Sequence, residues 1–244
     1  MNKLPKFDDQ NIDLPFGVPV QKSIVDNFSG IQKFGYNPSV PTTFETICDA
    51  STNYVYPTSA TTATVTSSDT VSDNNGTVEI QGLDASYNLQ TATATIGGSA
   101  TTESFIRVFR VRMITANTGS SNVGTITVTV DSKTVAQILP DNGQTLMCVY
   151  TIPANHKGYL LSLNGGTSKQ KEVEFKLLSK SITNGNVFNT KAYQSTFGMS
   201  FTRHYLIPEV FTEKTDIEIR AKADATTSVS AGFELLLEDI TYSG

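Results

Sequence analysis

Apolar and polar residues alternate at every second position in several segments of the chain. The clearest segments are 124–130, 171–177, 216–221 and 233–235. A period of two is the pattern of a β-strand that buries one face and exposes the other to water. Helical periodicity is almost absent from the chain. The pattern therefore predicts an all-β protein.

Turn signals separate these strands at short intervals. Short Thr-rich strands are expected between residues 44 and 98, and longer ones follow from residue 104. In 106–113 the apolar positions shift by one residue after Val108, which indicates a β-bulge. Residues 126–130 and 135–139 flank a short turn and predict a hairpin. This spacing is typical of an antiparallel, jelly-roll-like β-sandwich.

The first 40 or so residues have a different character, because five prolines interrupt them and their apolar residues have no sustained period. We expect an extended N-terminal arm over 1–43 and a β-sandwich over 44–244. An alternative divides the sandwich into a smaller Thr-rich part at 44–100 and a main part at 101–244. The arm cannot bury its own apolar side chains, so we expect these to dock on another subunit: Phe7, Ile12, Leu14, Phe16, Val18 and Val20.

Composition narrows the classes of partner. Of the 244 residues, 17% are charged and the formal net charge is -5, which argues against nucleic acid because phosphate binding needs clustered Lys and Arg. No apolar run approaches the ~18 residues of a membrane span, and the N-terminus lacks the apolar segment of a secretory signal. We expect a soluble protein made in a reducing cytoplasm, with Cys48 and Cys148 as buried free thiols.

Few residues offer chemistry. His156 and His204 are the two histidines, and neither lies at a metal-ligand spacing with another His or Cys. No nucleophile motif of the G-x-S-x-G kind is present. We therefore expect no catalytic residues, no metal and no cofactor.

Paired carboxylates are the remaining route to catalysis, because glycoside hydrolysis uses two of them. Glu172 and Glu174 share one strand face, as do Glu234 and Glu238, but the alternation places both pairs on the solvent side. Glycan binding stays open, since Tyr and Phe rings could contact sugars although the chain has no Trp.

Three stretches resemble known proteins: 31–47, 135–153 together with 158–160, and 213–221 continuing to 230–235. They are similar to virion structural proteins of tailed phages, especially marine and cyanobacterial ones. The resemblance spans most of 31–240, whereas the Thr-rich stretch 58–72 has no counterpart. Its motifs are structural, with no catalytic signature attached, and it implies a place in a virus particle.

The resemblance and the physical pattern lead to one expectation. The chain is a non-enzymatic virion structural protein, made in the host cytoplasm, that forms a homo-oligomer and contacts capsid or neck proteins. A capsid-associated decoration or cement protein, or a head–neck accessory, is favoured. The alternative is a tail or fibre adhesin that binds host-surface glycan, and a β-rich glycan hydrolase is a third class.

Overall fold

The computed structural model describes residues 17–22 and 24–242 of the chain, and strands account for most of them. The one helix in these residues, α1 (Gly17–Gln21), has five residues. Every strand pairing is antiparallel. The prediction of an all-β, antiparallel protein is confirmed.

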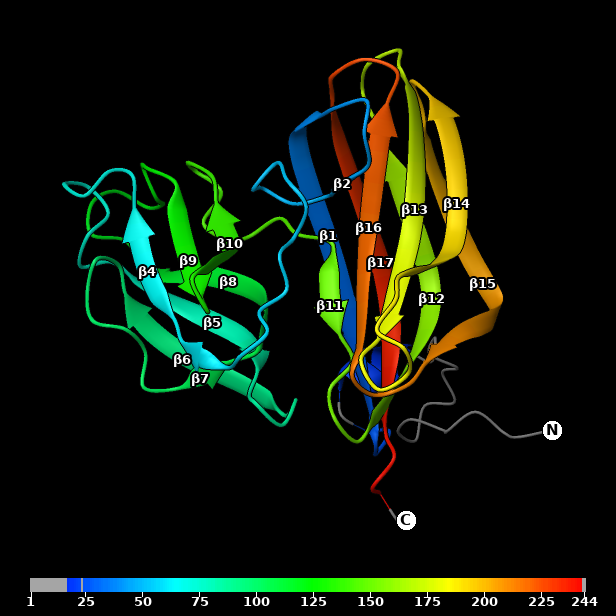
Figure 1. The fold of residues 1–244 in the computed structure, drawn as a ribbon, viewed down its shortest axis with the longest axis horizontal. Helices are drawn as coiled ribbons and strands as arrows, with labels where there is room; N and C mark the ends of the chain where they lie inside the picture. The colour runs from blue at the N-terminus through cyan, green and yellow to red at the C-terminus, as the bar shows by residue number, and fades with distance from the viewer. Residues whose placement is uncertain (1–16, 23, 243–244) are drawn as a thin grey trace, which may run out of the picture.

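Two sheets form the larger unit, on the right in Figure 1. The first sheet has the order β1 (Phe28–Val40), β17 (Thr227–Asp239), β12 (His156–Gly166), β15 (Ser200–Phe211). The second has the order β11 (Val149–Thr151), β16 (Thr215–Ala223), β13 (Glu172–Ser181), β14 (Asn189–Phe197), and β2 (Glu45–Thr46) also pairs with β16.

The core of this sandwich comes from alternate residues of the facing strands. Leu160, Phe175, Ile219 and Phe233 are almost completely buried there. Phe175, Ile219 and Phe233 each lie in a segment where apolar residues recur at every second position, so the period of two in the sequence corresponds to the core-facing side of these strands.

The chain changes sheet at nearly every connection of the sandwich. It passes from the first sheet to the second and back, and two pairs of consecutive sandwich strands, β2 with β11 and β13 with β14, lie within one sheet. The two antiparallel layers together form a β-sandwich. β14 and β15 lie at the same side of the sandwich, each at the edge of its sheet.

One strand of the sandwich is interrupted by a second unit. Thr46 of β2 pairs with Arg220 of β16. Val149 of β11 pairs with Glu218, which precedes Arg220 by two residues on the same strand. The two short strands are therefore halves of one strand position. About a hundred residues leave the sandwich after the first half and return at the second.

The inserted unit is all-β and has its own core (left in Figure 1). Its strands are β3 (Thr61–Thr62), β4 (Thr64–Ser67), β5 (Thr77–Leu83), β6 (Leu89–Thr95), β7 (Ser104–Phe105), β8 (Arg107–Thr115), β9 (Ile126–Val130) and β10 (Lys133–Ile138). The expected hairpin is β9–β10. The expected bulge is also present, because Gln81 and Gly82 pair with Arg110 and Val108 and skip Phe109.

The structure corrects two predicted boundaries. Residues 28–40, predicted as part of the arm over 1–43, form β1 and pair with β17 from Phe28 to Asn37 and again at Val40. The alternative boundary at residue 100 is also wrong, because β8 pairs with β5 inside the inserted unit while β1 and β2 belong to the sandwich. Strands that pair in this fold are far apart in the sequence. The predicted boundaries divided the chain into consecutive blocks, and such a division cannot represent one unit inserted into another.

Candidate functional site

The residues with candidate chemistry lie far apart in the fold. His156 begins β12 and its Nδ1 lies 2.7 Å from the carbonyl oxygen of Ala154, whereas His204 is exposed on β15. Among residues 17–22 and 24–242, no group of three or more His, Cys, Asp or Glu side chains could hold a metal ion. No helix in the same residues is long and apolar enough to cross a membrane.

The two carboxylate pairs lie on outward faces of the sandwich, as predicted. Glu174 lies 3.0 Å from the Lys222 ammonium, and Glu172 is exposed. Glu234 accepts hydrogen bonds from Ser162 and Gln32. These carboxylates bind neighbouring side chains on open sheet faces.

The two cysteines are free and buried, as predicted. They lie at the junction of the two units, where Cys48 forms a β-bridge with Met147, the residue before Cys148. Burial raises the pKa of the Cys48 thiol to about 12, so the thiol is protonated at neutral pH. A reactive cysteine needs a lowered pKa, and this environment does the opposite.

A charged network joins the two units. The Arg107 guanidinium of β8 donates two hydrogen bonds to the Asp216 carboxylate of β16, at 2.8 and 3.0 Å. Thr151 donates a third hydrogen bond to this carboxylate at 2.7 Å, and the Lys180 ammonium lies 3.4 Å from it. The Arg107 side chain is 5% exposed and that of Asp216 is fully buried.

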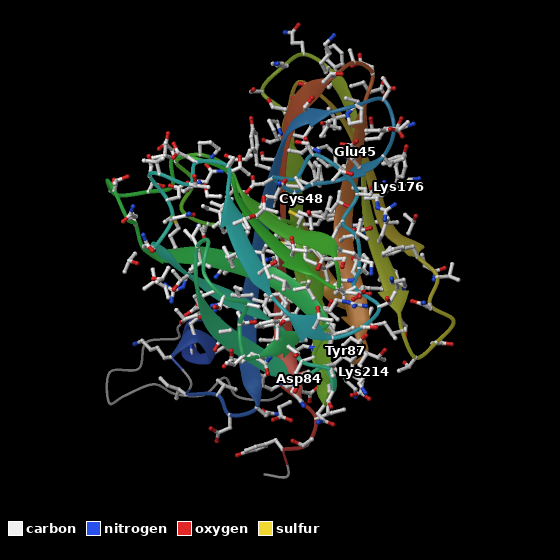
Figure 2. The ribbon with its side chains drawn as sticks, turned by 60° about the vertical axis from the view of Figure 1, so that its left-hand side comes forward. Glu45, Cys48, Asp84, Tyr87, Lys176 and Lys214 are labelled. Carbon is white, nitrogen blue, oxygen red and sulfur yellow. The ribbon has the colours of Figure 1, made fainter. Side chains whose placement is uncertain are left out.

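Glu218, two residues along the same face of β16, extends the network. Its carboxylate accepts hydrogen bonds from Arg220, at 2.6 Å, and from Thr46, at 3.1 Å. Burial raises the pKa of Glu218 above its usual value, although Arg220 opposes this shift. Figure 2 shows a further contact across the junction, where Tyr87 of the inserted unit lies beside Lys214 of the sandwich.

This network was not predicted from the sequence. The alternation over 216–221 placed Asp216 and Glu218 on a wet strand face, yet both are fully buried. The inserted unit covers that face of β16. Because the inserted unit comes from a distant part of the chain, the alternation of apolar and polar residues in β16 does not show that its polar face is covered. The one available signal was the density of charge, since Asp, Glu and Arg occupy the whole polar face of one strand.

A different surface is exposed and apolar. Leu206 is 100% exposed and Ile207 is 88% exposed, both on β15. They lie in a large bulge, because residues 205–208 stand opposite the single residue Leu161 of β12. Other exposed apolar side chains lie on β15, on β14 and in the turns beside them. We name these seven residues the apolar edge: Val187, Tyr193, Phe197, Met199, Leu206, Ile207 and Val210.

Of the predicted arm residues, Phe7, Ile12, Leu14 and Phe16 lie outside the described residues, and the side chain of Val18 does as well. Val20 is 3% exposed and belongs to α1, which packs against β1. Val20 is therefore buried within its own chain, and its predicted role as an anchor on another subunit is wrong. The pattern missed this because five helical residues are too few to show a period.

Comparison with known proteins gives little more. No family model matches the chain, and no curated protein matches it. Among solved structures, it is weakly similar to infectious bursal disease virus, Gt strain, with 13% sequence identity, 92% of this chain and 76% of that chain covered, and a TM-score of 0.21. A TM-score of this size does not establish a shared fold.

Proposed function

We propose that the protein is a non-enzymatic virion structural protein that acts through contacts between subunits, and that its apolar edge is a contact surface. The observation that carries this proposal is the gathering of seven large exposed apolar side chains along two neighbouring edge strands. Soluble monomers rarely expose many large apolar side chains in one region, and where this occurs it usually marks an interaction site.

Both edge strands have a free side. In the described residues, β14 pairs with β13 alone and β15 with β12 alone. The bulge at 205–208 interrupts the edge of β15, and Pro208 within it has no backbone N–H to donate. Continuous strand pairing to a neighbour is blocked there, so side chains of the bulge make the contact. Such a contact favours a closed oligomer over an open stack of strands.

The resemblance of 31–47 and 135–153 to tailed-phage virion proteins supports a virus particle as the setting. A decoration or cement protein on the capsid, or an accessory at the head and neck, would use such a surface against a second copy and against other virion proteins. Synthesis in the host cytoplasm agrees with the two buried, unpaired thiols.

The test is the oligomeric state of the full chain by sedimentation velocity, with Leu206→Asp and Ile207→Asp combined in one variant. We expect the wild type to sediment as an oligomer and the variant as a monomer with an unchanged melting temperature. The matched control is Val71→Asp, because Val71 is 85% exposed on the inserted unit, away from the apolar edge.

Incorporation into particles completes the test, by complementation with tagged protein. The variant should be depleted from purified virions and the control should be retained. A monomeric wild type, together with normal incorporation of the variant, would refute the role of the apolar edge.

A further inference from the structure

A hollow of about 720 Å³ lies on the outer face of the first sheet. Residues from all four strands of that sheet line it, and they stand in register. Tyr36 of β1 pairs with Ser230 of β17, which pairs with Gly166 of β12, which pairs with Ser200 of β15. The hollow therefore crosses the sheet at right angles to the strands. Three strand spacings give it a length of about 14 Å.

Gly166 lies at the floor of this hollow. A Cβ atom at Gly166 would lie 2.9 Å from the Cα atom of Ser200. A contact this short does not occur, so this position accepts no side chain without a backbone shift. The sheet is consequently bare at Gly166, while the residues around it carry side chains.

Five polar side chains in the lining have no hydrogen-bond partner among the residues that the structure describes. No hydrogen bond joins a described residue to the side chains of Asn164, Ser200, Thr202, Ser228 or Ser230. On the same sheet face, by contrast, Ser162 and Gln32 both donate hydrogen bonds to Glu234. The hollow thus presents several hydrogen-bond donors and acceptors to a ligand. The neighbouring polar side chains of Ser162, Gln32 and Glu234 are already hydrogen-bonded to one another.

The ring of Tyr36 adds an apolar surface at one end. It is half-exposed, and it makes no ring or cation contact with a described residue. An aromatic face with a polar tip suits a ligand that has both C–H and O–H groups.

The lining carries no charge. It consists of Ser, Thr, Asn, Gly, Tyr, Phe and Met residues, without Asp, Glu, Lys, Arg or His. Anionic ligands such as phosphates or sialylated glycans are bound through cations or charge-assisted hydrogen bonds, and this hollow offers neither from its lining. A neutral ligand rich in hydroxyl groups matches the chemistry of the hollow. Each unpaired amide or hydroxyl group of the lining can replace a hydrogen bond to water by a hydrogen bond to a ligand hydroxyl.

From this geometry we propose that the hollow binds a neutral oligosaccharide of two or three units. The sugar C–H face lies on the Tyr36 ring, and the sugar hydroxyls bond to Asn164, Ser200 and Ser230. This inference goes beyond the subunit contacts proposed above and does not depend on them. Met199 belongs both to the lining and to the apolar edge, whereas the residues proposed to contact the sugar lie outside the apolar edge.

The experiment is isothermal titration calorimetry of the full chain with three neutral probes: cellotriose, maltotriose and tri-N-acetylchitotriose. The trisaccharide 3′-sialyllactose serves as the charged comparison. We expect at least one neutral probe to bind with a Kd below about 1 mM and the sialylated probe to bind more weakly.

Variants place the binding in the hollow. Tyr36→Ala and Asn164→Ala should each raise the Kd of the bound probe about tenfold, whereas Tyr36→Phe should change it less than about threefold. The matched control is Phe34→Ala, on the same strand and sheet face but outside the lining. Melting temperatures confirm that each variant is folded. Absence of binding by every neutral probe, tighter binding of 3′-sialyllactose, or binding unaffected by both Ala variants would overturn the proposal.

Discussion

At the scale of single residues, Arg107 and Arg112 offer a direct comparison, because both lie on β8 and both form an ion pair with a carboxylate. Arg107 pairs with the buried Asp216, and Arg112 pairs with Glu79 at the surface. Removing one partner of a buried pair leaves an uncompensated charge, which costs about 3–5 kcal/mol. An exposed pair contributes little, because water and salt screen it.

We therefore expect Arg107→Met to lower the free energy of unfolding by about 3–5 kcal/mol in urea titrations. Arg112→Met should leave the urea midpoint nearly unchanged. If the two variants have similar midpoints, the buried pair does not stabilise the junction in the way its geometry indicates.

Lys33 is a second buried charge, on β1. Burial lowers its pKa to about 7, with a further contribution from Arg110, and its ammonium group donates to the carbonyl oxygen of Phe109. The unfolded chain, with a lysine pKa of about 10.4, binds more protons than the folded chain between pH 7 and 10. Stability from this residue therefore rises with pH across that window.

The prediction concerns a difference between two proteins. From pH 7 to pH 9, the wild type should gain stability relative to Lys33→Met, by at most about 1.4 kcal/mol per pH unit. Urea midpoints at several pH values measure it, and Lys157→Met, at an exposed position, serves as the control. Parallel pH profiles for wild type and Lys33→Met would contradict the lowered pKa.

At the scale of elements, the period of two predicted the strands well and their surroundings less well. The period of two identified β9, β13, β16 and β17, because a strand that buries one face has apolar residues at every second position of its own sequence. It could not show that the inserted unit covers the polar face of β16. It also missed β1, where Pro38 and scattered apolar residues suggested an arm, although pairing with β17 holds the segment in the sheet.

Two deletions separate the arm from the strand. Removing 1–30 takes away the buried Val20 and the first three residues of β1, which pair with 236–238 of β17. We expect the melting temperature to fall by roughly 5 °C or more, since burial of one such side chain is worth about 2 kcal/mol. Removing 1–16 should leave the melting temperature unchanged but weaken incorporation into particles, if Phe7, Ile12, Leu14 and Phe16 dock on another subunit. Unchanged incorporation of the shorter deletion would remove that role from the arm.

At the scale of the whole molecule, two cores are joined where one strand position is split. The sequence indicated two β-rich parts by the change from short Thr-rich strands to longer ones. It could not place the insertion, because β2 and β11 have two and three residues and their shared partner, β16, lies far along the chain. The hollow on the first sheet was equally hidden, since its residues come from four strands that only the pairing brings into one row.

The charged network predicts that the two units unfold together. Asp216 and Glu218 belong to the sandwich, and they bind Arg107 of the inserted unit and Tyr56 of the segment that leads into it. Unfolding of the inserted unit would break the ion pair with Arg107 and the hydrogen bond from Tyr56, so each folded unit stabilises the other through these contacts. Differential scanning calorimetry should show one transition for the wild type, with calorimetric and van't Hoff enthalpies that agree.

A variant that combines Asp216→Asn and Glu218→Gln keeps the shape of these side chains but removes their charges. It should show two transitions, and its calorimetric enthalpy should exceed the van't Hoff enthalpy of either one. Glu174→Gln, which disrupts the half-exposed pair with Lys222, should keep the single transition. Two transitions in the wild type would show that the units are independent. A single transition in the double variant would instead assign the coupling to the split strand, where the chain crosses twice between the two cores.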